Sequence, residues 1–166
     1  MRLLDPVDYQ IAAARVVEGV TRELAALIPG CRVEHVGASA IPGAISKGDV
    51  DVCVVVPPPL HPSAVSRLEA AGYVVKADTL RTPELCMLLS PRTDVDLALQ
   101  VVAQGSRFEF FMRFRDALRG DQSLVDQYNA VKRRAAGLSH GQYRDAKAAF
   151  IASVLQSAAP AVIPTD

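Results

Sequence analysis

One strand-like segment constrains the fold of this chain more than any other. Residues 50–56 read Val-Asp-Val-Cys-Val-Val-Val, and three prolines follow directly at 57–59. β-Branched residues are enriched in central strands, and proline cannot donate a hydrogen bond to a strand ladder. The sequence therefore predicts a buried central β-strand that ends at residue 56.

The residues before this strand predict a long N-terminal helix. Asp5-Pro6 is a typical helix start and Pro29-Gly30 a typical stop, so we expect a helix from Pro6 to about Leu27. Its apolar face is predicted from residues that recur near helical spacing, namely Val7, Ile11, Ala14, Val17, Val20, Leu24 and Leu27.

The other elements are predicted from local patterns in the same way. We expect short strands over 32–36 and 73–76, a helix over 61–71, a β-hairpin from 85–89 and 94–102, and helices over 108–119, 123–136 and 142–157. This order of elements predicts an α+β fold, an α/β mixed sheet with flanking helices and a helical C-terminal half.

Length and charge limit the classes of protein that this chain can belong to. With 166 residues, we expect a single domain over 1–157 and a flexible tail over 158–166. Acidic and basic residues balance at 18 each, so no overall field draws the protein to nucleic acid or to a membrane surface. Neither a signal peptide nor an apolar run of about 20 residues is present, so a cytoplasmic protein is expected.

A loop of small residues leads into two aspartates at the start of the central strand. Gly37 begins a turn in which backbone N–H groups can approach phosphate oxygens, Ser39 can donate its hydroxyl, and Lys47 can neutralise phosphate charge. Asp49 and Asp51 are two residues apart, so on a strand they share a face and can converge on a divalent cation. A plain connecting loop with acids at a strand end explains the same residues equally well.

A second acidic pair, Asp94 and Asp96, precedes the second hairpin strand. If that strand lies beside residues 50–56, one of the two can face the first pair as a third metal ligand or as a general base. Asp96 is favoured, because Asp94 adjoins the turn and can simply cap it.

The helical half is locally basic. Residues 107–147 hold nine basic and five acidic side chains, an excess of 9 − 5 = +4. This excess can meet a triphosphate, and solvated helix faces explain most of it equally well. Tyr128 and Tyr143 can stack on a base or pack in a core, and His35 is expected to orient the loop by hydrogen bonding.

Several motifs in order resemble known families. Gly37-Ala38-Ser39, nine intervening residues and Asp49-Val50-Asp51 resemble the signature of polymerase β-like nucleotidyltransferases. Glu34-His35-Val36-Gly37, Ile41-Pro42-Gly43 and Lys47 resemble the GrpB family more narrowly. The segments around Arg115, Tyr128-x-x-Val131-Lys132 and Tyr143-x-x-Ala146-Lys147 resemble that family's helical half. The resemblance extends over roughly residues 33–155.

Two departures from these patterns bear on activity. Ala38 stands where both patterns usually carry a serine, so a phosphate-contacting hydroxyl is lost unless Ser39 replaces it. Asp49 stands where GrpB proteins often have an aliphatic residue before the single aspartate that matches Asp51. The pair is thus nearer to the general nucleotidyltransferase signature.

The resemblance implies a nucleotidyltransferase fold and a metal-dependent transfer of a nucleotidyl group from a nucleoside triphosphate to a small acceptor. It implies Mg²⁺, or Mn²⁺ in its place, held by Asp49, Asp51 and Asp96, which would be the catalytic residues. Phosphate contacts would come from Gly37, Ser39, Lys47, Arg115, Lys132 and Lys147. The alternative is a non-catalytic nucleotide-binding or accessory module, linked to coenzyme A metabolism because some relatives are fused to dephospho-CoA kinase. Acceptor, base preference and oligomeric state stay open.

Overall fold

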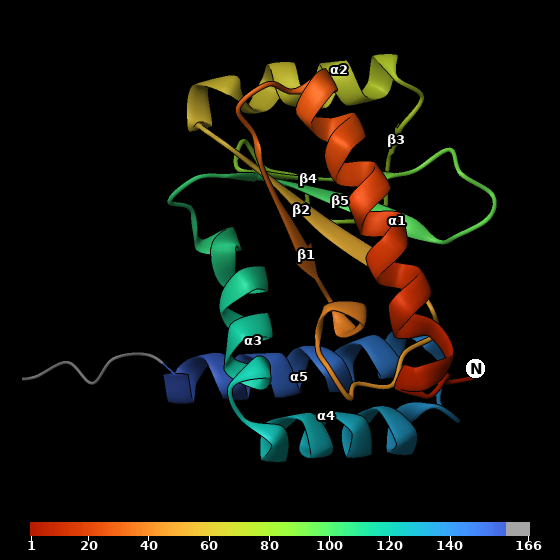
Figure 1. The fold of residues 1–166 in the computed structure, drawn as a ribbon. Coiled ribbons are helices and arrows are strands. Elements are labelled where there is room, and N and C mark those ends of the chain that lie inside the picture. The colour runs from red at the N-terminus through yellow and green to blue at the C-terminus, as the bar shows by residue number, and fades with distance from the viewer. Residues whose placement is uncertain (159–166) are drawn as a thin grey trace, which may run out of the picture.

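A computed structural model describes residues 1–158 of the chain as a mixed sheet with helices on both faces (Figure 1). Its strands are β1 (Arg32–Val36), β2 (Val50–Val56), β3 (Val74–Val75), β4 (Leu85–Leu89) and β5 (Leu97–Ala103). Its α-helices are α1 (Pro6–Leu27), α2 (His61–Ala70), α3 (Phe110–Arg119), α4 (Gln122–Ala135) and α5 (His140–Ala158). The α+β fold class is therefore confirmed. No helix within residues 1–158 is long and apolar enough to cross a membrane.

The sheet has the order β1-β2-β5-β4-β3. β2 and β5 are parallel neighbours at its centre, and the other pairs are antiparallel. All seven residues of β5 are buried, as are all of β2 except Asp51, which is half-buried. Strands covered on both faces need near-continuous apolar sequence, which explains the valine run of β2.

The predicted hairpin is confirmed, but its second strand starts later than predicted. β4 and β5 pair with Leu89 opposite Ala98, and β5 begins at Leu97, not at residue 94. The connection is a turn held by Arg92, whose guanidinium donates to both carboxylate oxygens of Asp94 at 3.0 and 2.7 Å. Asp94 therefore belongs to the turn.

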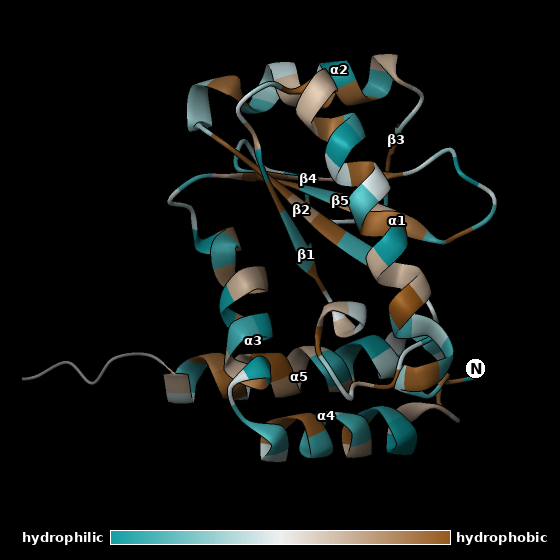
Figure 2. Ribbon diagram, viewed as in Figure 1, coloured by the Kyte–Doolittle hydropathy of each residue, from teal (hydrophilic) through white to brown (hydrophobic). Residues whose placement is uncertain are grey.

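Each face of the sheet packs against different helices. Even-numbered β2 residues such as Val52 and Val54 point toward the core under α1 and α2. The odd-numbered residues Cys53 and Val55 point to the opposite face, where the start of α3 covers them. α4 and α5 form a further layer beyond α3 (Figure 1). Helix sequences alternate between hydrophobic and hydrophilic residues, as expected for helices that bury one side (Figure 2).

Two local predictions were wrong in detail. The buried face of α1 includes Val20 and Leu24, as predicted, but its first half is made by Tyr9 and Ala13, whereas Val7 and Ile11 are 86% and 70% exposed. The Tyr9 hydroxyl donates to the Ala44 carbonyl at 2.7 Å, a partner 35 residues away. α4 begins at Gln122, one residue before the predicted start, and Asp121 caps it by accepting from the Ser123 N–H at 2.9 Å.

α5 begins two residues before and ends one residue after the helix predicted over 142–157. Ala158 is the last residue of α5, and the remainder of the predicted tail, 159–166, lies outside the described residues.

Candidate functional site

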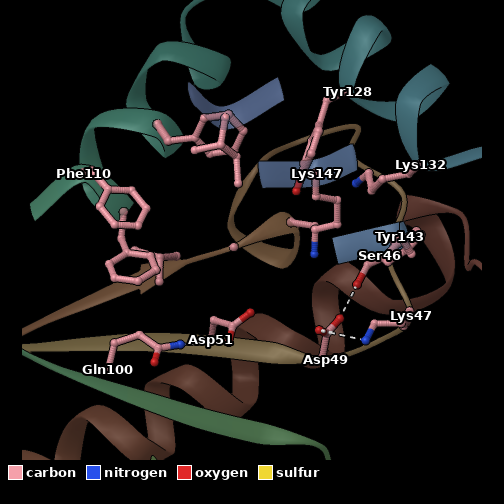
Figure 3. Close-up of a pocket in the computed structure, with 16 residues that line it drawn as sticks. Ser46, Lys47, Asp49, Asp51, Gln100, Phe110, Tyr128, Lys132, Tyr143 and Lys147 are labelled. Carbon is pink, nitrogen blue, oxygen red and sulfur yellow. Dashed lines mark hydrogen bonds and ion pairs between the residues drawn. The ribbon is translucent and has the colours of Figure 1, made fainter. Parts of the chain in front are cut away.

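A cavity of about 220 Å³ lies between the sheet and the helical layer (Figure 3). Its wall combines the turn after β1, the start of β2, one residue of β5 and side chains from α3, α4 and α5. Elements from both halves of the chain therefore build one site, which the sequence order alone does not place together.

Asp49 and Asp51 both line this cavity, as their spacing predicts. The Ser46 hydroxyl donates to Asp49 Oδ1 at 2.9 Å, and Lys47 Nζ lies 3.9 Å from Asp49 Oδ2. Gln100 Nε2 donates to Asp51 Oδ1 at 3.3 Å. The two carboxylates are thus oriented by neighbours that leave other oxygen lone pairs for a ligand.

Asp51 is held in an environment that opposes its negative charge. Burial, with Asp49 as the second cause, raises the pKa of Asp51 to about 7. A bound cation would relieve this cost, because an opposite charge nearby favours the ionised carboxylate. The site is therefore electrostatically suited to a positive ligand next to Asp51.

Gly37 is required by its contact with Asp51. Its φ of 72° lies in the left-handed region, and a Cβ added there would lie 2.7 Å from Asp51 Oδ2. A side chain at this position would therefore meet both backbone strain and a clash with the carboxylate. The glycine of the turn allows the backbone to lie directly against the acid.

Ser39 does not face the cavity. It is buried, its Oγ lies 2.8 Å from His35 Nε2, and it is not part of the cavity wall, whereas Ala38 is. The expected role of His35 in orienting the loop is confirmed by this hydrogen bond. The turn Gly37-Ala38-Ser39 therefore presents its backbone and the Ala38 methyl group to the cavity, and no hydroxyl group.

The loop between the turn and β2 is fixed by α4. Asn129 accepts from the Ile45 N–H at 2.9 Å and donates to the Gly43 carbonyl at 2.8 Å. The Lys132 ammonium donates to the Ile45 carbonyl. With Tyr9 bonded to Ala44 from the other side, the loop is held on two helices. Such anchoring keeps Ser46 and Lys47 in place at the cavity.

Three lysines surround the acidic pair: Lys47, Lys132 and Lys147 all line the cavity. Lys132 is 1% exposed and its Nζ lies 4.0 Å from the Tyr128 ring centre. Burial, followed by the nearby charge of Lys147, lowers the pKa of Lys132 to about 7. Lys147 Nζ lies 5.4 Å from the Tyr143 ring centre. Both tyrosines are buried wall residues, so they serve packing while facing the cavity.

Arg115 is not part of the cavity wall. Its Nη1 donates to Glu34 Oε2 at 2.6 Å and to the His35 carbonyl at 2.9 Å, and its Nε donates to Asp116 at 2.8 Å. These contacts use Nε and Nη1 of the guanidinium and attach α3 to β1. The structure therefore places Arg115 in a scaffold role.

Arg115→Leu is expected to lower the free energy of unfolding by about 2 kcal/mol, because the half-buried Glu34 carboxylate and the His35 carbonyl lose their donor. Urea unfolding measures this loss. Arg113→Leu, an exposed position on the same helix, is the matched control and should change stability by less than about 0.5 kcal/mol. Unchanged stability together with weaker phosphate binding in Arg115→Leu would contradict the scaffold role.

Asp96 lies near the pair without joining the cavity. Its carbonyl accepts from the Val50 N–H at 2.8 Å, and its carboxylate contributes to the raised pKa of Asp51. Its side chain is exposed and is not part of the wall, and Ala98 is the β5 residue opposite Asp51. Among residues 1–158, no three His, Cys, Asp or Glu side chains are grouped to hold a metal. The structure does not bring Asp96 together with Asp49 and Asp51.

Sequence reasoning missed the apolar wall of the cavity. Phe110, Phe111 and Phe114 from α3 contribute to it, together with Gln100 from β5. No local pattern marks the phenylalanines, because α3 is amphipathic and any of its apolar residues could be core. Gln100 did carry a signal, since it is the one polar residue of the strand Leu-Ala-Leu-Gln-Val-Val-Ala.

The fold is that of a nucleotidyltransferase. The structure is similar to the Cid1 poly(U) polymerase bound to MgGTP, with a TM-score of 0.54 and 15% identity over 76% of this chain and 42% of that one. A cytoplasmic RNA terminal U-transferase is similar at a TM-score of 0.55 and 15% identity, over 78% of this chain and 40% of that one. At these identities the likeness concerns the fold.

The chain belongs to the GrpB family, whose profile, described as GrpB protein, matches residues 6–157. A UPF0157 protein of Vibrio cholerae is 47% identical over 91% of this chain and 80% of its own length. A second UPF0157 protein, from Halalkalibacterium halodurans, is 33% identical over 76% of this chain and 67% of its own. The crystal structure of GrpB from Enterococcus faecalis has a TM-score of 0.77, at 20% identity over 94% of this chain and 96% of that one.

Proposed function

We propose that this protein binds a nucleoside triphosphate with a divalent cation in the cavity and transfers its nucleotidyl group to a small acceptor. The observation that carries the proposal is the placement of Asp49 and Asp51 in one cavity with three lysine ammonium groups. Two carboxylates beside a cluster of cations form a site for a phosphate chain that carries its own metal. The fold supports the same reading.

The residues present fit a cation that is shared with the substrate. Mg²⁺ is commonly held by one or two carboxylates and completes its shell with phosphate oxygens and water. Asp49 and Asp51 would provide those two carboxylates, and Mn²⁺ would be accepted by the same oxygen ligands. When bound, the cation would neutralise charge on the phosphates. Asp96 stays a predicted third ligand or base, which Asp96→Asn tests.

The remaining groups of the cavity would bind and orient the phosphates. The ammonium groups of Lys47, Lys132 and Lys147 would neutralise negative oxygens, and the backbone at Gly37 and Ala38 would approach them closely. Because Ser39 turns to His35 and Arg115 to Glu34, we assign the predicted phosphate contacts of those two residues to positioning the turn instead.

The affinity of the cavity for sulfate, without divalent cation, is expected to fall about tenfold between pH 6 and pH 8.5. The pKa of Lys132, lowered to about 7, means that this ammonium loses its charge over that range. The pKa of Asp51, raised to about 7, means that this carboxylate gains a negative charge over it. Both changes weaken the binding of an anion. The loss of one charged hydrogen bond lowers the affinity about tenfold.

Calorimetric titration at constant ionic strength measures this pH dependence, because sulfate keeps its charge throughout the range. Lys132→Met is the matched variant and should bind sulfate more weakly at pH 6, with a flatter pH profile. A sulfate affinity that is constant or rises with pH would contradict the electrostatic description of the site.

A non-catalytic nucleotide-binding module is the second candidate function. It is favoured by Ala98 opposite Asp51 on β5, by the exposed position of Asp96, and by Ala38 at the cavity wall. A site of this kind would bind nucleotide without the third carboxylate that a two-metal transfer uses.

Pyrophosphate release distinguishes the two candidates. The full chain is incubated with ATP, GTP, CTP or UTP, with Mg²⁺ or Mn²⁺, and with pools of small hydroxyl compounds. Acceptor-dependent pyrophosphate release that is lost in Asp49→Asn supports the transferase. Metal-dependent nucleotide binding without any release supports the module, and the absence of binding by all four nucleotides would overturn both.

A further inference from the structure

The cavity has two chemically different ends, on either side of Asp51. Figure 3 shows Phe110 and Gln100 on one side of this carboxylate, and Asp49 with the three lysines on the other. The strand register gives the same order. Asp49 comes directly before β2, Asp51 is its second residue, and Gln100 pairs with Cys53, two residues beyond Asp51. We call these the phenylalanine end (Val36, Gln100, Phe110 and Phe111) and the lysine end (Asp49, Lys47, Lys132 and Lys147).

The phenylalanine end offers a flat, uncharged surface. The rings of Phe110 and Phe111 stack with centres 4.2 Å apart at 27°, and both residues are only half-buried in the protein. Gln100, 6% exposed, directs its amide N–H to Asp51. Arg115 of α3 is paired with Glu34, and the cavity wall formed by the described residues contains no arginine. Aromatic rings that face a cavity gain most from contact with another planar, apolar group.

We infer that the phenylalanine end is the acceptor subsite and that the acceptor carries its hydroxyl next to a flat, uncharged aromatic group. This inference rests on the proposed function. Phosphoryl-type transfer places the attacking and leaving oxygens roughly in line through phosphorus. With pyrophosphate held by the lysines and the α-phosphorus beside Asp51, the acceptor oxygen must come from the opposite side, which is the phenylalanine end.

The transfer balances with no further reactant. The acceptor hydroxyl oxygen forms a bond to the α-phosphorus, and the bond from that phosphorus to the bridging oxygen breaks. Pyrophosphate leaves with the bonding electron pair, and the hydroxyl proton passes to solvent. The product is an aromatic alcohol or phenol esterified to a nucleoside monophosphate.

The inference is tested with benzyl alcohol as the acceptor probe and glycerol as the polar comparison, on the full chain. Ligand-observed NMR should detect binding of benzyl alcohol and not of glycerol. Phe110→Ala should weaken the binding of benzyl alcohol about tenfold. The dissociation constant of the nucleoside triphosphate with Mg²⁺ should stay within about twofold of its value in the unmodified protein. Leu138→Ala, at an exposed residue between α4 and α5, should change neither affinity.

A competition experiment shows which ligand occupies the ring surface of the phenylalanine end. If benzyl alcohol and the magnesium nucleotide bind together, the acceptor assignment is supported. If the nucleotide displaces benzyl alcohol, or if Phe110→Ala weakens both, the surface belongs to the nucleobase and the inference is overturned. The absence of benzyl alcohol binding overturns it as well. Failure of all four nucleotides to bind would instead refute the proposed function.

A second variant guards against a simple folding defect. Phe110→Leu keeps apolar volume and removes the flat ring, so it should retain the thermal unfolding midpoint while still weakening benzyl alcohol. Equal affinity for benzyl alcohol in Phe110→Leu and in the unmodified protein would show that ring stacking contributes nothing, which contradicts the aromatic assignment.

Discussion

At pH 8, Asp51→Asn is expected to raise the free energy of unfolding by about 2–3 kcal/mol. Burial and the neighbouring Asp49 raise the pKa of Asp51 to about 7, well above the ordinary value of 3.8. The favourable contribution of this group is complete below about pH 4 and is lost as the pH rises through about 7. Each pH unit of separation corresponds to about 1.4 kcal/mol, and partial exposure of the residue reduces the total. Asparagine cannot ionise and so avoids the cost.

Urea unfolding at pH 4.5, 6 and 8 measures this effect. The gain of Asp51→Asn over the unmodified protein should be near zero at pH 4.5 and largest at pH 8. Asp94→Asn, in the exposed turn, is the control and should change stability only slightly and without this pH dependence. A difference for Asp51→Asn that is flat across pH would show that the carboxylate is not destabilised by its surroundings. A gain in stability on removing a functional group is a common sign of an active or binding site.

Gly37→Ala is expected to lower the free energy of unfolding by about 2–3 kcal/mol. The left-handed backbone at φ 72° costs a non-glycine residue about 1 kcal/mol or more. The new Cβ would also lie 2.7 Å from Asp51 Oδ2, so the turn or the carboxylate must shift. Gly30→Ala is a matched control, because its φ is 81° and nothing lies within 4 Å of the added Cβ. The control should cost less than Gly37→Ala, because its added Cβ meets no neighbouring atom.

A double-mutant cycle isolates the contact with the carboxylate. In an Asp51→Ala background the Oδ2 and Cγ atoms are gone and only the Cβ contact at 3.2 Å is left, so Gly37→Ala should cost clearly less than in the unmodified protein. Equal costs of Gly37→Ala in the two backgrounds would show that Asp51 does not press against the turn.

Local sequence patterns predicted most of the fold, because they report local physics. The valine run, the proline stops and the helical spacings correctly located β2, the hairpin and the helices. Val20 and Leu24 of the α1 face were predicted correctly, but Tyr9 was not, because its partner, the Ala44 carbonyl, lies 35 residues away. Secondary structure is encoded nearby, whereas the orientation of an element depends on distant partners.

The same distinction applies to the candidate site. Gly37, Asp49, Asp51 and Lys47 lie within 15 residues, so their spacing was informative. Arg115 could not be assigned from sequence, because its partner Glu34 is 81 residues away and turns it from the cavity. The phenylalanine end could not be predicted from the sequence either, because it forms only where α3 crosses the sheet.

We propose that Asp49 and Asp51 bind a nucleoside triphosphate through a shared divalent cation. Isothermal titration of ATP, GTP, CTP and UTP, with and without Mg²⁺, tests it on the unmodified protein, on Asp51→Asn and on Asp96→Asn, with Asp94→Asn as the surface control. We expect at least one nucleotide to bind at least about tenfold more tightly with Mg²⁺, and this gain to disappear in Asp51→Asn while the variant stays folded. Asp96→Asn would lose the gain only if this carboxylate completes the metal site. Nucleotide affinity that is independent of Mg²⁺, or unchanged in Asp51→Asn, would contradict the account.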